Sequence, residues 1–304
     1  MKVLIINHRE PIAPEVATQI NASVQLYQKE PENFDLDEAL SKHQAVEVLV
    51  ATYHDLTAER LSALTKLKAI VLTTTAYEYV DLAYCREHGI KVFNNSGYSQ
   101  TAVAEHLLAL LMAAARRIPL LDKNLRQGDF NQFDQPGFEF YGKTLGVIGM
   151  GHIGQTFAHL CTGFGMNLIY YNRSVKALPY QQVSLETLAQ QADAIAVSIP
   201  LTDQTYKLLN EAFFAQLKPG AVMASIAADE VLDKNAFHQA VVDGVIHGAG
   251  LDLHEPWPEM QAFPQIVMTP VKGWYTRECM QRRTSTWIKT LNAYLAGEDI
   301  RGIV

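Results

Sequence analysis

An α/β fold built on parallel sheets is predicted by three features of the 304-residue sequence. Short runs rich in β-branched and aliphatic residues alternate with helical stretches along most of the chain. These apolar runs lack strict alternation with polar residues, which is typical of strands that helices cover on both faces. One run ends in a glycine-rich turn that opens a helix. The length is sufficient for two domains, each with its own hydrophobic core.

The first 98 residues form one array of alternating strands and helices. Their apolar runs recur about every 20 residues, which fits successive β-α-β crossovers. This spacing predicts a parallel, flavodoxin-like sheet. Strands are expected at 3–6, 24–27, 46–51, 69–73 and 91–93, and helices at 36–43 and 80–88.

The next segment is expected to connect this array to a second one. A long helix is predicted from Thr101 to Arg117, ending before Pro119. Residues 123–142 are poor in aliphatic side chains and contain three glycines and a proline, so we expect an arm there. Further along, strands are predicted at 192–198, 221–225 and 248–251, and helices around 184–191, 211–216 and 233–243.

The second array begins with the strand, turn, helix and strand pattern of a dinucleotide-binding unit. An apolar run ends at Ile148, and after it come Gly149-Met150-Gly151-His152-Ile153-Gly154, a helix, and a second apolar run that ends at Tyr171. Gly149 allows a tight turn, Gly151 lets the backbone approach a pyrophosphate, and Gly154 lets the helix pack on the strand. The helix N-terminus then faces the phosphates. Glycines can also serve only as turn or cap residues, but the two flanking strands favour nucleotide binding.

The residues after the second strand, Asn172-Arg173-Ser174, indicate which dinucleotide binds. An acidic residue at this place takes the ribose 2′-hydroxyl of NAD, whereas an arginine accommodates the 2′-phosphate of NADP. No carboxylate is present, and Arg173 can pair with a phosphate while Asn172 and Ser174 donate hydrogen bonds. The alternative is a solvated arginine on an exposed turn. NADP is therefore favoured, with NAD as the second choice.

Charge and cysteine usage exclude several classes of function. A formal charge of −7 gives the chain no counter-charge for nucleic acid or for an anionic membrane. Cys85, Cys161 and Cys279 are isolated, so we expect free thiols and neither a disulfide framework nor a metal site. The apolar start is too short for a signal peptide, and residues 102–115 are too few to span a bilayer. We expect a cytoplasmic protein.

Several further motifs give the chain a family resemblance over nearly its whole length. Together with the glycine fingerprint, the sequence resembles the D-isomer-specific 2-hydroxyacid dehydrogenases. The matching stretches are Tyr77–Asp81, Tyr98-Ser99, Ala102–His106, Gly142–Gly146, Pro200–Thr202 with Thr205 and Asn210, Leu217–Ala221, Ala249–Asp252, Thr269-Pro270 and Leu291–Gly297.

The resemblance implies a Rossmann coenzyme domain inserted into a flavodoxin-like substrate domain. The substrate domain would comprise residues 1–98 and 277–304, and the coenzyme domain residues 99–276. A small-molecule ligand would bind in the cleft between them, and two copies would form a homodimer through the coenzyme domains. The family reduces 2-oxo acids, or oxidises 2-hydroxy acids, with a nicotinamide cofactor. In it, Asp252 would face the nicotinamide amide, and the strand end Ser198-Ile199-Pro200 would lie along the cofactor.

The three chemical positions of the family are replaced in this chain. The family uses an arginine to bind the substrate carboxylate, a histidine as proton donor, and a glutamate that orients the histidine. Their places are taken by Ala228, Val271 and Trp257, and no arginine occurs between Ser174 and Thr276. Glu255 is present but stands two positions short of the family glutamate. In the substrate domain, Ala76 replaces the usual glycine of the loop that binds the carboxylate.

Two hypotheses on function remain open at this stage. The first is an NAD(P)-binding protein that has lost 2-oxo acid reduction. The second is an NADP(H)-dependent oxidoreductase with an altered substrate or proton donor. Lys272, His254 and His106 are the candidate donors, although each is also typical of a surface or structural residue. The aromatic residues Trp257, Trp274 and Tyr275 would either narrow the pocket or only pack between the domains.

Overall fold

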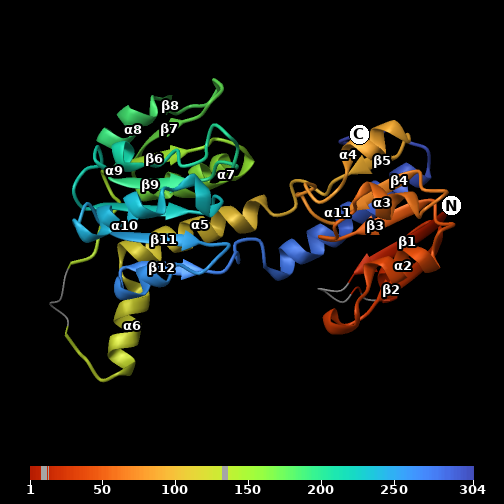
Figure 1. The fold of residues 1–304 in the computed structure, drawn as a ribbon. Coiled ribbons are helices and arrows are strands. Elements are labelled where there is room, and N and C mark those ends of the chain that lie inside the picture. The colour runs from red at the N-terminus through yellow and green to blue at the C-terminus, as the bar shows by residue number, and fades with distance from the viewer. Residues whose placement is uncertain (8–11, 13, 132–135) are drawn as a thin grey trace. The chain divides into compact units, whose positions relative to one another are not determined.

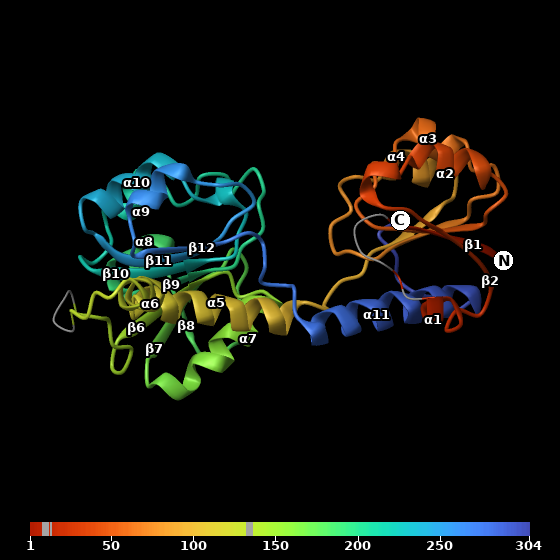
Figure 2. The same ribbon diagram turned by 90° about the horizontal axis from the view of Figure 1, so that it is seen from below.

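The computed structural model describes residues 1–7, 12, 14–131 and 136–304 (Figure 1). The chain divides into two compact units, one formed by Met1–Ser99 with Arg277–Val304 and the other by Gln100–Thr276. Each unit contains its own parallel β-sheet with helices on both faces (Figures 1 and 2). The predicted α/β fold class is confirmed.

The first unit is built on a five-stranded sheet of order β2-β1-β3-β4-β5, with all strands parallel. This is the flavodoxin-like order, which the crossover spacing of the sequence predicts. The strands are β1 (Lys2–Asn7), β2 (Ser23–Gln28), β3 (Val48–Ala51), β4 (Ala69–Leu72) and β5 (Lys91–Phe93).

Helices cover both faces of this sheet. Side chains of Asp35, Thr57 and Asp81 accept hydrogen bonds from backbone N–H groups in the first turns of α2, α3 and α4, and so begin these helices. The C-terminal helix α11 packs Trp287 and Leu291 against the sheet. The helices are α1 (Pro14–Ala17), α2 (Leu36–Lys42), α3 (Ala58–Ser62), α4 (Leu82–Glu87) and α11 (Arg277–Leu295).

The second unit is built on a seven-stranded parallel sheet of order β12-β11-β10-β9-β6-β7-β8. The chain runs outward from β6 in one direction and from β9 in the other, so the order reverses between these two strands. Dinucleotides bind at such a switch point, outside the carboxyl ends of the strands. The strands are β6 (Thr144–Ile148), β7 (Asn167–Tyr171), β8 (Gln181–Gln182), β9 (Ala194–Val197), β10 (Ala221–Ser225), β11 (Ile246–Asp252) and β12 (Ile266–Thr269).

Helices also cover this sheet, with α5 and α7 on one face and α8, α9 and α10 on the other (Figure 2). Glycines of β11 let α5 approach closely, because a Cβ at Gly250 would lie 2.6 Å from the Leu110 Cβ. The helices are α5 (Gln100–Ala115), α6 (Ile118–Arg126), α7 (His152–Leu160), α8 (Leu185–Gln191), α9 (Glu211–Phe214) and α10 (Lys234–Val242), with a 3₁₀ turn at Asp229–Val231.

The prediction of an arm at residues 123–142 is wrong for residues 123–126, which belong to a helix. Arg117 adopts a left-handed conformation (φ 52°) that ends α5, and a second helix, α6, then continues to Arg126. Pro119 lies in the first turn of α6, where a missing N–H costs no hydrogen bond. Pro119 therefore belongs to the start of α6, and the left-handed Arg117 before it separates α6 from α5. Residues 132–135 of the predicted arm lie outside the described residues.

The three cysteines lie in the interiors of the two units. The three cysteines are buried free thiols, and burial raises the pKa of Cys85 to about 11 and that of Cys161 to about 12. Within the described ranges, no helix is long and apolar enough to cross a bilayer. The same residues contain no group of three or more His, Cys, Asp or Glu side chains placed to bind a metal ion.

Candidate nucleotide-binding and catalytic site

The glycine turn after β6 is fixed by close backbone contacts. Gly149 has a φ of 101° and donates its N–H to the Tyr171 carbonyl at 2.9 Å. The Ser198 hydroxyl donates to the Gly149 carbonyl at 2.9 Å, so the end of β9 braces the turn. A Cβ at Gly154 would lie 1.9 Å from that same carbonyl oxygen. Gly149 and Gly154 are therefore required by packing as well as by any ligand.

Gly151 is different, because it leaves open space. It is the exposed N-cap residue of α7, and a Cβ built on it would meet nothing within 4 Å. No side chain caps the start of this helix. The first backbone N–H groups of α7, at His152 and Ile153, therefore remain available, together with the positive end of the helix dipole. This arrangement fits the pyrophosphate of a dinucleotide.

A pocket of ≈ 270 Å³ lies beside the glycine turn at the end of β7. Two cationic side chains, Arg173 and Lys176, line it, and no carboxylate does. Arg173 donates from Nη1 to the Gln204 Oε1 at 3.2 Å, a single neutral partner that a phosphate can replace. The remaining lining residues are Gly151, Tyr171, Asn172, Ser174, Ile199, Pro200, Thr202, Gln204 and Thr205.

Asn172 connects this pocket to the glycine turn. Its Oδ1 accepts the Met150 N–H at 3.1 Å, and its Nδ2 donates to the Ser174 carbonyl and hydroxyl at 2.8 and 3.1 Å. The side-chain amide of Asn172 therefore holds the backbone around the pocket in position. Ser174 keeps a hydroxyl hydrogen to donate, because its oxygen is the acceptor in that contact.

Asp252, at the carboxyl end of β11, organises the segment that follows β12. It is 7% exposed, and its carboxylate accepts hydrogen bonds from the Thr269 hydroxyl (2.6 Å) and from the N–H groups of Lys272 (2.8 Å) and Gly273 (2.9 Å). The His106 Nε2 lies 2.9 Å from the Thr269 Oγ1 and 3.6 Å from the carboxylate. Burial raises the pKa of Asp252, but the nearby His106 ring and the hydrogen bonds from Thr269 and the backbone outweigh it and lower the pKa to about 2.

The three positions that the sequence analysis matches to the arginine, glutamate and histidine of the family make structural contacts. Ala228 precedes the 3₁₀ turn, and its carbonyl accepts the Val231 N–H at 3.0 Å. Trp257 is 2% exposed and packs edge-on against Phe237, with ring centroids 5.9 Å apart. Val271 has a φ of 47°, a strained value for a β-branched residue. Ala228 and Val271 have no polar side-chain atom, and Trp257 has only a buried indole N–H, so none of the three supplies a cation or an acidic proton.

The candidate proton donors occupy different surroundings. Lys272 is exposed, and its ammonium lies 4.5 Å from the centre of the Tyr275 ring. His106 is engaged by Thr269. His254 lies with its Nδ1 3.2 Å from the Oδ1 of Asp229, a buried carboxylate. Asp229 and Lys176 were not among the site residues expected from the sequence. The signal available for Asp229 was a carboxylate directly after Ala228, the position matched to the family arginine.

In the first unit, the loop after β4 adjoins a buried arginine. Arg283 of α11 is 5% exposed and donates to the Thr73 carbonyl and hydroxyl, each at 2.9 Å. The Thr74 hydroxyl donates to the Ala76 carbonyl at 2.9 Å. Ala76 is not among the described non-glycine residues with positive φ, so the loop does not need glycine at this position.

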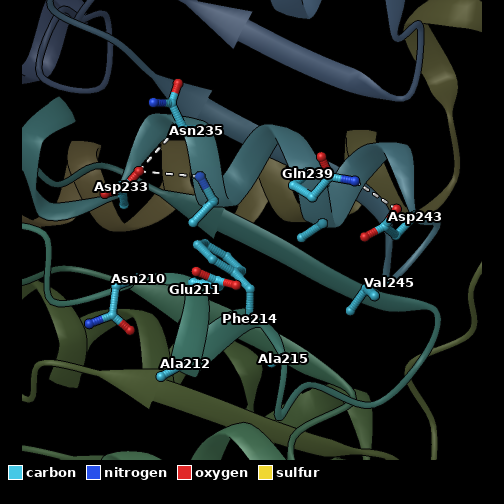
Figure 3. A pocket seen from close by; sticks show the side chains of 12 residues that line it. Asn210, Glu211, Ala212, Phe214, Ala215, Asp233, Asn235, Gln239, Asp243 and Val245 are labelled. Atoms are coloured by element: carbon cyan, nitrogen blue, oxygen red, sulfur yellow. Dashed lines mark hydrogen bonds between the residues drawn. The ribbon is translucent and has the colours of Figure 1, made fainter.

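A hollow of ≈ 820 Å³ lies between α9 and α10, away from the glycine turn (Figure 3). Its polar groups are largely engaged with one another: Asp233 accepts the N–H groups of Asn235 and Ala236, and Gln239 donates to Asp243 at 2.8 Å. None of the predicted site residues lines this hollow.

Comparisons with known proteins agree with this geometry. The chain is 34% identical to glyoxylate reductase of Thermococcus litoralis over 276 residues, covering 85% of this chain and 83% of that protein. It is 32% identical to hydroxypyruvate reductase of Thermotoga maritima, covering 91% and 94%. Among solved structures, an acyclic imino acid reductase (Bsp5) in complex with NADPH and D-Arg is 28% identical, with a TM-score of 0.87 and both chains fully covered.

The family itself follows from a match across most of the second unit. Residues 108–273 match the NAD binding domain of the D-isomer specific 2-hydroxyacid dehydrogenases. This range includes the glycine turn, the pocket after β7 and Asp252. The chain therefore belongs to the D-isomer specific 2-hydroxyacid dehydrogenase family of oxidoreductases, whose coenzyme domain binds a nicotinamide dinucleotide.

Proposed function

We propose that this protein binds NADP(H) in preference to NAD(H). The observation that supports the proposal most is the paired cations Arg173 and Lys176 in a pocket without carboxylates. A 2′-phosphate there gains charge-assisted hydrogen bonds, whereas the 2′-hydroxyl of NAD lacks the charge to pair with two cations. Calorimetric titration with NADPH and NADH tests the preference. Equal affinities would contradict it, and binding of neither would contradict nucleotide binding altogether.

We further propose that reduction of 2-oxo acids is lost. Ala228, Trp257 and Val271 replace the arginine, glutamate and histidine, so no cation polarises the carbonyl and no histidine donates the proton in the family manner. An electrostatic donor of this kind contributes roughly 10²–10³ to the rate and a proton donor roughly 10²–10⁴. The factors are not additive, yet the absence of either puts turnover close to background.

A second candidate function is NADP(H)-dependent reduction of an imine. Hydride transfer to a ketone leaves negative charge on oxygen, which a cation must stabilise. An imine nitrogen is more basic, and the amine formed after protonation and hydride transfer is neutral, so no oxyanion forms that an arginine would have to stabilise. The similarity to an imino acid reductase that binds NADPH supports this candidate. Oxidation of NADPH by a 2-oxo acid only when an amine is added would be its signature.

Homodimerisation through the second unit is also proposed. Helix α6 has no buried residue, and it exposes Ile118, Leu121 and Leu125 along one side, at 54%, 47% and 59%. In Figure 1 this helix projects from the sheet of its unit. An apolar stripe of this kind on an otherwise polar helix fits a protein interface. Light scattering should give the mass of a dimer, and Leu121→Asp with Leu125→Asp should give a monomer. A monomeric wild-type protein at micromolar concentration would contradict the proposal.

A further inference from the structure

A carboxylate and a histidine form a defined pair beside the replaced arginine position. Asp229 belongs to the 3₁₀ turn after β10 and is 8% exposed. Its Oδ1 accepts the backbone N–H of His254 at 2.9 Å and lies 3.2 Å from the His254 Nδ1. Its Oδ2 accepts the N–H of Glu255 at 3.2 Å. The histidine backbone and ring are thus both fixed by one buried carboxylate.

This contact determines how the imidazole can act. A carboxylate can only accept, so Nδ1 must be the donor and carries a hydrogen. The other ring nitrogen, Nε2, then points away from Asp229. The His254 side chain is 57% exposed, whereas Asp229 is buried. An exposed ring nitrogen on a histidine oriented by a carboxylate is the arrangement that proton-transfer catalysts use.

The pair lies at the edge of the sheet where a nicotinamide is expected. β10 and β11 are neighbouring parallel strands, with Ser225 paired to Leu251, so the segments after them lie at the same edge. The glycine turn after β6 and Ser198 after β9 lie at that edge too. Ligands of open α/β sheets bind outside this edge. His254 comes two residues after Asp252, which by family resemblance faces the nicotinamide.

We propose that His254 is the proton donor for reduction of an imine and that Asp229 is its positioning residue. This inference rests on the second function proposed above. The imine carbon accepts a hydride from bound NADPH, and the π electrons of the C=N bond move to nitrogen. Nitrogen takes the Nε2 proton of the His254 imidazolium, which leaves an amine, NADP⁺ and a neutral imidazole with its hydrogen on Nδ1, and solvent then returns a proton to Nε2. No oxyanion forms, so the chemistry agrees with Ala228 in place of arginine.

The activity test measures NADPH oxidation with pyruvate or phenylpyruvate, each alone and with methylamine, which forms the imine in water. We expect oxidation only with methylamine. His254→Gln should lower kcat by about 10²–10⁴, as removal of a general acid does, and leave the Kd for NADPH within about twofold. His159→Gln, an exposed histidine on α7, is the matched control and should be unaffected. Asp229→Asn should lower kcat without changing KM, because a positioning residue does not bind substrate.

A second readout does not depend on turnover. In ¹⁵N-edited NMR spectra, Nδ1 of His254 should be protonated, and the His254 signals should shift on titration with NADP⁺ while those of His159 do not. Unshifted His254 signals at saturating NADP⁺ would overturn the inference, as would unchanged kcat in His254→Gln. Binding of NADPH with no turnover of any imine overturns this inference alone. Failure to bind NADPH overturns the proposed function, and the inference with it.

Discussion

The nucleotide side and the catalytic side of the second unit differ in what fixes their residues. On the nucleotide side, Gly149 and Gly154 are required by backbone contacts that a Cβ would violate. On the catalytic side, the positions of Ala228, Trp257 and Val271 can be occupied by side chains that pack or turn the chain without doing chemistry. Folding therefore accounts for Gly149 and Gly154 without any ligand, whereas no contact of the fold requires a charged side chain at the three positions on the catalytic side. Such a fold can therefore hold a cofactor site whether or not it performs the reaction of its family.

The largest expected effect is on stability, from Trp257→Glu, which places a glutamate at the position matched to the family glutamate. Trp257→Glu places a carboxylate in a site that is 2% exposed and packed against Phe237, and it also leaves a cavity. We expect a loss of about 3–5 kcal/mol in the free energy of unfolding, measured with urea. Tyr275→Ala, at an aromatic side chain that is 52% exposed, should cost about 1 kcal/mol or less. A stable Trp257→Glu protein would contradict this expectation and show that the fold accepts a glutamate at this position.

The next largest effect is expected on NADPH binding, from the cations of the pocket after β7. Arg173→Ala should weaken NADPH binding by about 1.5–3 kcal/mol, the contribution of a hydrogen bond to a charged group, and leave NADH binding almost unchanged. Lys176→Ala should also weaken NADPH binding, but by less than Arg173→Ala. Arg126→Ala, which removes an exposed arginine paired with Asp122 on α6, serves as the control. Equal losses for both nucleotides would assign Arg173 to the shared part of the cofactor.

Two alanine substitutions separate packing from ligand contact within one turn. Gly154→Ala should destabilise the fold by about 1–3 kcal/mol, because its Cβ would lie 1.9 Å from a backbone oxygen. Gly151→Ala meets nothing within 4 Å, so it should leave stability within about 0.5 kcal/mol and weaken NADPH binding alone. Thermal unfolding and titration of both variants provide the test. If Gly151→Ala binds NADPH normally, the pyrophosphate does not approach this residue.

Asp252 predicts a pH dependence of stability on the catalytic side. Its folded pKa of about 2 lies below the ordinary value of 3.8, so it stabilises the fold above about pH 4. That contribution, about 2 kcal/mol, is lost as the pH falls from about 4 towards 2. Asp252→Asn should remove this part of the pH dependence, whereas Asp203→Asn, at an exposed aspartate, should leave it unchanged. Identical urea curves against pH for wild type and Asp252→Asn would contradict the assignment.

The fold could be predicted from the sequence where the pattern is long and local. The apolar runs and the glycine turn predict both parallel sheets and most strands next to the site, but not β12 (Ile266–Thr269). β8 was missed because it has only two residues, Gln181 and Gln182, that pair with β7 without any apolar pattern. α6 was missed because Pro119 was interpreted only as a stop signal.

The candidate site was predictable only in part, for a related reason. The roles of the three glycines could be predicted from their spacing, because Gly149, Gly151 and Gly154 all lie in one turn. The contact between Asp229 and His254 joins residues 25 positions apart through the pairing of β10 with β11, and single-sequence patterns do not specify such a contact. The burial of Trp257 likewise depends on Phe237 of α10.

Steady-state oxidation of NADPH with glyoxylate, pyruvate and hydroxypyruvate, without added amine, tests the central claim most directly. The same protein sample must first be shown by titration to bind NADPH. The account predicts binding that is tighter than for NADH, together with turnover no higher than background for all three 2-oxo acids. Robust reduction of any of them would contradict the account, because it would show that the catalytic side still performs the family reaction without its arginine, glutamate and histidine.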